Sequence, residues 1–195
     1  MTPILIRQAA AACAIAALAG CASTTSPGAV DVDRRQLLIV PAAQVEQMAQ
    51  TSFNEQNDKA RSLGKLVTQG VEYDRVRRIS ARLQQQAPVF RPDAAGWNWE
   101  LALIDSPALN ASCAPGGKIT VYTGIIRTLQ LTDDELAMVI GHEIAHALRE
   151  HGRERVSQAM AQNMIGSVVM GALQTSEAQA KTASQVADVL LTLPN

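Results

Sequence analysis

The sequence contains very little cysteine, and this scarcity argues against a disulfide-stabilised domain and against a cysteine protease. Only three of the 195 residues are cysteine, at positions 13, 21 and 113. Cys13 lies in an apolar leader that we expect to be removed, and Cys21 directly follows that leader. Cys113 then has no partner for an intramolecular disulfide. Every histidine falls between positions 142 and 151, so none lies elsewhere to activate the thiol, which disfavours a cysteine protease.

The chain also has almost no net charge and few long apolar runs. Lys and Arg number 17 against 18 Asp and Glu, and this balance gives no reason to expect nucleic-acid binding. The content of 47% hydrophobic and 18% charged residues fits one modest globular domain. Polar residues such as Gln158 and Asn163 interrupt the apolar stretch 156–173. That stretch predicts a packed helix, with a membrane-contacting helix as the alternative.

Residues 1–20 have the pattern of a secretory signal peptide. Arg7 supplies the positive end, and the alanine-rich run 9–19 is too short for a stable transmembrane helix. The run closes with Leu-Ala-Gly before Cys21, which resembles a bacterial lipobox and predicts that Cys21 is lipidated. The alternative is an ordinary cleaved signal with a chance cysteine. Because Ala22 rather than Asp follows the cysteine, we expect an outer-membrane lipoprotein that faces the periplasm.

The three histidines cluster around the motif His-Glu-Ile-Ala-His at positions 142–146. On a helix, His142 and His146 share one face with Cβ atoms roughly 5–6 Å apart. Two imidazoles at this separation can both bind one zinc ion, and Glu143 can accept a proton from water activated by the metal. The motif therefore predicts a zinc-dependent peptidase, with one Zn²⁺ as its cofactor.

The sequence around the motif favours a helix that begins after Thr132. Thr132 and Glu135 form a capping box, and apolar residues then recur at the helical period. Gly152 is expected to end the helix. Small residues such as Gly141 suggest close packing near a metal and weigh against a chance motif on a surface helix. His151 does not fit the metzincin spacing, and we expect it to be a polar residue at the helix end.

The rest of the chain predicts an α+β fold, mostly helical with a small β-sheet. The helices expected besides the motif helix cover 42–63, 73–86 and 124–131, with Pro88 and Pro92 ending the second. Strands are expected over 97–104 and 118–123, separated by a loop over 107–117. Trp97 and Trp99 are expected to pack in the core, with a membrane-binding or sugar-binding surface as the alternative.

Four stretches together resemble the HtpX/CAAX-prenyl-endopeptidase family of zinc metallopeptidases (peptidase family M48), and in particular its periplasmic BepA- and LoiP-like branch. They are Arg34–Leu38, the segment from Asn110 to Gly124 that contains Pro-Gly-Gly, the motif helix Leu136–His146, and Leu193–Asn195. The resemblance implies a zincin-like (gluzincin) domain. It also implies an edge strand that pairs with the substrate backbone, for which Ala114, Gly116 and Gly117 are the candidate residues. A tight turn that needs positive φ is the alternative for the two glycines.

The same resemblance implies a third zinc ligand, a glutamate in a helix beyond Asn195. We therefore expect a chain truncated at its C-terminus. The expected organisation is a signal peptide over 1–20, a lipidated cysteine and solvated tether over 21–36, and an incomplete metallopeptidase domain over 37–195.

The expected function is a zinc metalloendopeptidase for protein quality control, anchored by lipid at the periplasmic face of the outer membrane. Its expected partners are polypeptide substrates from the cell envelope, the membrane itself, and outer-membrane assembly machinery. The alternative is a non-enzymatic assembly or chaperone-like factor with an incomplete zinc site.

Overall fold

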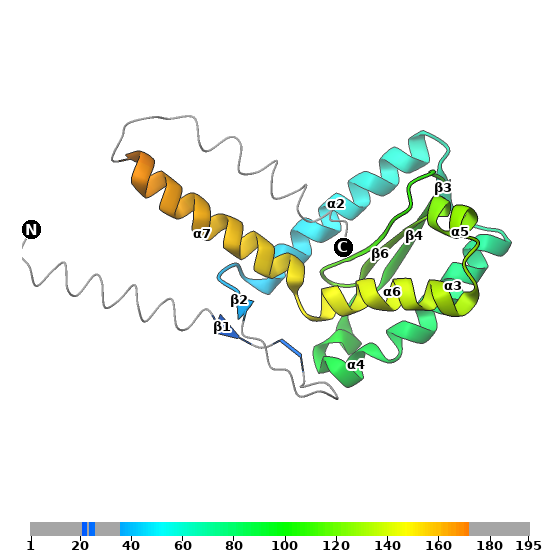
Figure 1. The fold of residues 1–195 in the computed structure, drawn as a ribbon, viewed down its shortest axis with the longest axis horizontal. Helices are drawn as coiled ribbons and strands as arrows, with labels where there is room; N and C mark the ends of the chain where they lie inside the picture. The colour runs from blue at the N-terminus through cyan, green and yellow to red at the C-terminus, as the bar shows by residue number, and fades with distance from the viewer. Residues whose placement is uncertain (1–20, 23, 26–35, 172–195) are drawn as a thin grey trace, which may run out of the picture.

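A computed structural model describes residues 21–22, 24–25 and 36–171 of the chain (Figure 1). This part is mostly helical with a small mixed sheet, which confirms the predicted balance of helices and strands. The predicted signal peptide over 1–20, most of the predicted tether and the stretch 193–195 lie outside the described residues.

The helices follow the expected order, with a short α-helix and a 3-10 helix as additions. They are α2 (Ala42–Ser62), α3 (Val71–Gln84), α4 (Ala87–Phe90), α5 (Thr123–Leu129), α6 (Asp133–Leu148) and α7 (His151–Gly171), with a 3-10 helix over Pro92–Gly96. The strands are β1 (Cys21–Ala22), β2 (Gln36–Leu37), β3 (Leu66–Val67), β4 (Glu100–Ile104), β5 (Ala111–Ala114) and β6 (Lys118–Tyr122). Helices α2, α3 and α5 begin and end within about two residues of their predicted limits, which is the usual uncertainty of helix ends.

The central sheet has four strands in the order β3-β4-β6-β5. β4 and β6 are parallel, with Leu103 opposite Val121, and the two outer strands run antiparallel to their neighbours. β5 therefore forms one edge of the sheet and pairs with β6 alone among the described strands. Its hairpin with β6 places the residues just before the Pro-Gly-Gly turn along this edge.

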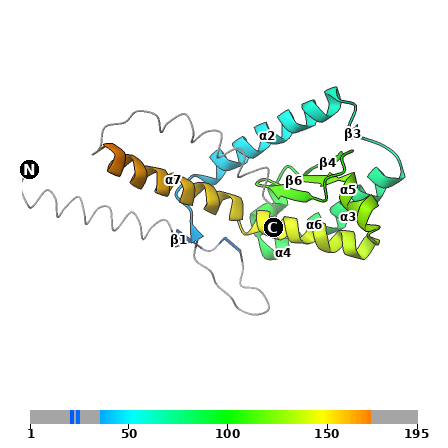
Figure 2. The ribbon, with the colours of Figure 1, turned by 45° about the horizontal axis from the view of Figure 1, so that its top comes forward.

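Helices cover both faces of the sheet, with α2 on one side and α3 and α6 on the other (Figures 1 and 2). The alternation of side chains along β4 explains this layering. Ala102 and Ile104 pack with Phe53 of α2, whereas Leu103 belongs to the larger core formed with α3 and α6. Leu136 and Ile140 of α6 are fully buried in that core. The motif helix is therefore fixed against the sheet by its apolar side.

Three local predictions were wrong. The strand expected over 97–104 is β4, which begins only at Glu100, so Trp97 and Trp99 precede it, although both side chains pack against the main core as predicted. Pro88 lies inside α4, where proline is tolerated in the first turn of a helix, so it does not simply end the preceding helix. The expected loop over 107–117 contains the edge strand β5.

The described N-terminal residues form a small antiparallel ribbon. Cys21 lies opposite Leu37 in the pair β1 and β2. Gln36, predicted to be the last residue of the solvated tether, is buried with 4% exposure and belongs to the folded part. Val156 of α7 packs against Val40 and Val45 at the start of α2. Among the described helices, none combines the length and apolarity needed to cross a bilayer.

Candidate metal centre and active site

Helix α6 carries the motif, and its N-terminus forms as predicted. The Thr132 hydroxyl accepts a hydrogen bond from the Glu135 amide at 3.3 Å, and the Glu135 carboxylate accepts one from the Thr132 amide at 2.8 Å. This reciprocal capping box satisfies amides that the helix leaves without internal partners. It sets where the helix begins, and the helical period then places His142 and His146 on one face.

The two motif histidines converge on one point. The Nε2 atoms of His142 and His146 lie 3.0 Å apart, and the two rings meet edge to face. Two nitrogens that bind one tetrahedral zinc ion at 2.0–2.1 Å are about 3.3 Å apart. The observed separation is close to this value. The pair therefore fits two ligands of one cation, held on a single rigid helix.

The electrostatic environment keeps His146 in the state that binds metal. Burial lowers the pKa of His146 to about 4, and the neighbouring imidazoles of His151 and His142 act in the same direction. At neutral pH the ring is therefore uncharged and has a nitrogen lone pair available. Metal binding requires this neutral form of histidine.

Glu143 lies on the side of α6 that faces the edge strand. It is half-buried, and its carboxylate acts on the thiol of Cys113 in β5. Burial first, and then this negative charge, raise the pKa of the Cys113 thiol, so Cys113 is a poor nucleophile. The structure thus carries the three motif residues on one helix, with the charge of Glu143 acting on β5.

The candidate substrate-strand residues fall on two different features. Ala114 ends β5 and is buried, whereas Gly116 and Gly117 form the turn to β6 with φ values of 75° and 81°. A Cβ atom on Gly117 would come within 2.6 Å of the Trp99 ring. The turn and the packing of Trp99 therefore account for glycine at position 117. Of these two features, β5 is the one with an edge that no other described strand pairs with.

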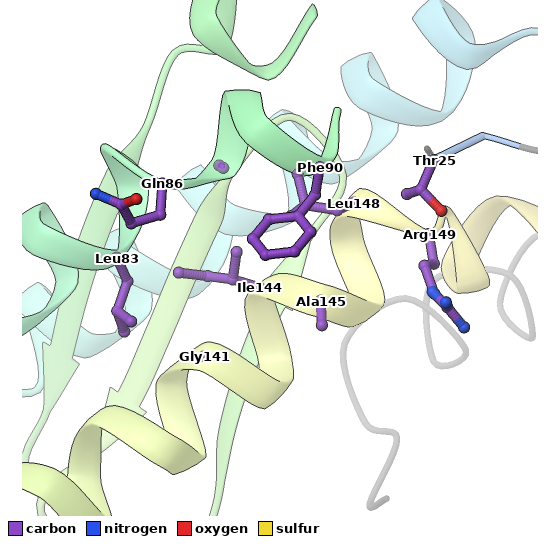
Figure 3. A pocket seen from close by; sticks show the side chains of 10 residues that line it. Thr25, Leu83, Gln86, Phe90, Gly141, Ile144, Ala145, Leu148 and Arg149 are labelled. Carbon is purple, nitrogen blue, oxygen red and sulfur yellow. The ribbon is translucent and has the colours of Figure 1, made fainter. Parts of the chain in front are cut away.

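The sequence predicts close packing at Gly141, and the structure does not show it. A Cβ atom there would meet only the Leu83 side chain, at an ordinary 3.8 Å. Instead, Gly141 lines an apolar pocket of about 420 Å³ between α3, α4 and α6. Leu83, Phe90 and Ile144 point toward this pocket from the three helices (Figure 3). The pocket borders the motif helix next to its histidine face.

The end of α6 differs from the prediction, and this changes the position of His151. The helix ends at Leu148, and α7 begins at His151 after a bend in which Glu150 has φ of 52°. Gly152 therefore lies in the first turn of α7 and does not end the motif helix. His151 belongs to the next helix, and its Nδ1 atom lies 2.5 Å from Nδ1 of His146. Sequence reasoning missed this contact because it depends on the bend.

Within the described part of the chain, no group of three or more His, Cys, Asp and Glu side chains is arranged to hold a metal ion. Glu150 and Glu154, two carboxylates that follow the motif, are buried and have other partners. Glu150 pairs with Arg91 and Arg153, and Glu154 accepts a hydrogen bond from Gln36. The predicted third ligand beyond Asn195 is outside the sequence, so its identity stays a prediction.

Comparison with known proteins adds independent information about residues 72–194. A model of peptidase family M48 matches this range. The mitochondrial metalloendopeptidase OMA1 of Arabidopsis thaliana is 41% identical over 63 residues, 32% of this chain and 13% of the relative. OMA1 of Bos taurus is 35% identical over 80 residues, 40% of this chain and 15% of the relative. OMA1 of Saccharomyces cerevisiae is 34% identical over 76 residues, 38% of this chain and 22% of the relative. The chain spans less than a quarter of each of these three relatives.

Proposed function

The chain belongs to peptidase family M48, and from this premise we propose that it acts as a zinc-dependent metalloendopeptidase whose site is His142, Glu143 and His146. The observation that carries the proposal is the 3.0 Å approach of the two histidine Nε2 atoms on one helix. Both histidines lie within the range that the family model matches. The names of the OMA1 relatives support the endopeptidase activity, and the general need of this family for a metal supports the cofactor.

The proposed division of labour follows from the chemistry of the side chains. A zinc ion supplies Lewis acidity, which polarises a peptide carbonyl and makes water easier to deprotonate. His142 and His146 hold the cation. Glu143 accepts the proton of the attacking water and then delivers it to the leaving amine. The zincin-like (gluzincin) arrangement is part of this proposal.

The edge strand β5 is the proposed binding site for the substrate backbone. An extended polypeptide can add to an open sheet edge through main-chain hydrogen bonds. β5 is such an edge among the described strands, and the electrostatic effect of Glu143 on Cys113 supports a position of the proposed base close to it. A peptide paired with β5 would therefore run beside the proposed base. Because the interactions are with the main chain, this mode favours unfolded polypeptides over a defined sequence.

Chelation should remove the activity of the chain reversibly. Treatment with 1,10-phenanthroline should stop cleavage of unfolded casein, and added Zn²⁺ should restore it because the site is refilled. The His142→Ala variant should bind no zinc with appreciable affinity and should not recover on zinc addition. Zinc content and casein cleavage are measured on the same preparations. Cleavage that persists in zinc-free protein would refute the proposal, and zinc binding without cleavage would support the non-enzymatic alternative.

We also propose that Cys21 carries lipid and anchors the chain at the periplasmic face of the outer membrane, in the manner of the BepA- and LoiP-like branch. The lipobox-like sequence before Cys21 and the following Ala22 support this location. Proteins of the cell envelope are then the proposed substrates, with outer-membrane assembly machinery as a proposed partner.

Lipidation can be tested with two matched cysteine variants. In bacteria fed labelled palmitate, the wild-type chain should incorporate label and fractionate with the outer membrane. Cys21→Ser should lose both properties, because it removes the only proposed acylation site. Cys113→Ser should keep them, since Cys113 lies within the folded domain in β5. Label retained by Cys21→Ser, or absent from the wild type, would contradict the proposal.

A further inference from the structure

The bend between α6 and α7 brings His151 back toward His146. In a continuous helix, residues five positions apart point about 140° away from each other around the axis. Here only Arg149 and Glu150 separate the two helices, and the left-handed backbone of Glu150 turns the chain. The centroids of the His146 and His151 rings are consequently 4.7 Å apart. The contact between them is a product of the bend.

Buried side chains from distant segments hold this bend in place. The Arg91 side chain donates a hydrogen bond to the Leu148 carbonyl at 3.2 Å, and Gln36 donates one to the Arg149 carbonyl at 2.8 Å. The Glu150 carboxylate, buried with the rest of its residue, pairs with Arg91 and Arg153. A non-glycine residue in the left-handed region is strained and persists only where the surroundings impose that conformation. The position of His151 is therefore well determined by the fold.

The close approach of the two Nδ1 atoms restricts the protons on His146. At 2.5 Å, one nitrogen donates and the other accepts. If His146 donates from Nδ1, its Nε2 atom has a free lone pair directed toward His142. If neutral His146 accepts at Nδ1, its proton sits on Nε2, at the place where a cation would bind. Only the first arrangement is compatible with a metal ligand.

We propose that His151 is a positioning residue for the metal site: it accepts the Nδ1–H of His146 and thereby keeps Nε2 of His146 free to bind zinc. This inference rests on the proposed function in that it takes His146 to be a ligand. Histidines that bind metals commonly donate their other ring N–H to an acceptor, which fixes the tautomer and the ring orientation. His151 contacts the opposite nitrogen of His146 from the one that faces His142, so it does not act as a third ligand of the same cation.

Two substitutions of similar size separate the acceptor role from packing. In His151→Asn, the side-chain oxygen can take the place of Nδ1 as an acceptor, whereas His151→Leu fills similar space without one. The chain has only three histidines, so its imidazole signals can be assigned by single substitutions. Two-bond proton–nitrogen NMR spectra of the metal-free chain should show His146 protonated on Nδ1 in the wild type and in His151→Asn. In His151→Leu the proton should move largely to Nε2.

Zinc affinity, measured by chelator competition, provides the second readout. Loss of such a partner weakens metal binding by about 10–100-fold, so we expect this loss in His151→Leu and a much smaller one in His151→Asn. A wild-type His146 protonated on Nε2 would overturn the inference, and this result needs no variant to fold. Unchanged affinity in a folded His151→Leu would also overturn it. A wild type with the expected tautomer that binds no zinc would support the hydrogen bond but refute the zinc peptidase.

Discussion

The Glu143→Gln variant should lose peptide cleavage almost completely while it keeps its zinc. An amide cannot accept the proton of the attacking water, whereas the ligands His142 and His146 are unchanged. General acid–base catalysis by a positioned side chain contributes typically about 10²–10⁴-fold to a rate, so we expect a loss of at least this order. The measurement combines casein cleavage with the zinc content of the purified variant.

Glu135→Gln provides the matched control on the same helix. Glutamine is accepted at this position of a capping box, and Glu135 lies two turns before the motif. Its cleavage rate and zinc content should equal those of the wild type. Retained cleavage in Glu143→Gln would remove Glu143 from the mechanism. Loss of zinc in the same variant would instead indicate that Glu143 contributes to metal binding.

The motif helix could be predicted closely from the sequence because its determinants are local. The capping box of Thr132 and Glu135 and the apolar periodicity involve residues at most a few turns apart. Both features are found in α6. The approach of His142 to His146 follows from the helix geometry alone. Local patterns of this kind need no knowledge of the rest of the fold.

The edge strand could not be predicted in the same way. The sequence of β5 is Ala-Ser-Cys-Ala, which is short and lacks the β-branched and aromatic residues typical of strands. Its extended conformation depends on pairing with β6, where Ala111 lies opposite Val121. The Pro-Gly-Gly segment predicted a turn, but the turn did not reveal the strand before it. Tertiary pairing therefore overrode a weak local preference.

The end of the motif helix shows the limit of reading residue types at single positions. The sequence predicts that Gly152 ends the helix, but the left-handed residue is Glu150, with φ of 52°. A glutamate adopts this conformation here because Arg91 and Arg153 bind its carboxylate. Arg153 lies only three positions after Glu150, whereas Arg91 lies 59 positions before it in the sequence. The same network explains why the contact of His151 with His146 could not be foreseen.

The Arg91→Met variant should lower the free energy of unfolding by about 3 kcal/mol, because it leaves buried acceptors without a donor. The side chains of Arg91 and Glu150 are only 10% and 8% exposed. Methionine preserves much of the apolar stem of Arg91 but removes the donor to the Leu148 carbonyl and the cation stacked on Trp97. Urea unfolding followed by circular dichroism avoids the change in tryptophan fluorescence that loss of this stacking would cause.

Arg127→Met is the matched control, and it separates the effect of burial from that of the ion-pair distance. Arg127 forms two shorter ion pairs, with Glu72 at 2.7 Å and Asp105 at 2.6 Å, but its side chain is 56% exposed. Water and salt screen such pairs, so their loss should change the unfolding midpoint far less than the loss of Arg91. Equal destabilisation by the two substitutions would contradict this account. It would mean that the buried network at the bend contributes no more than surface charge pairs, and the bend would then need another cause.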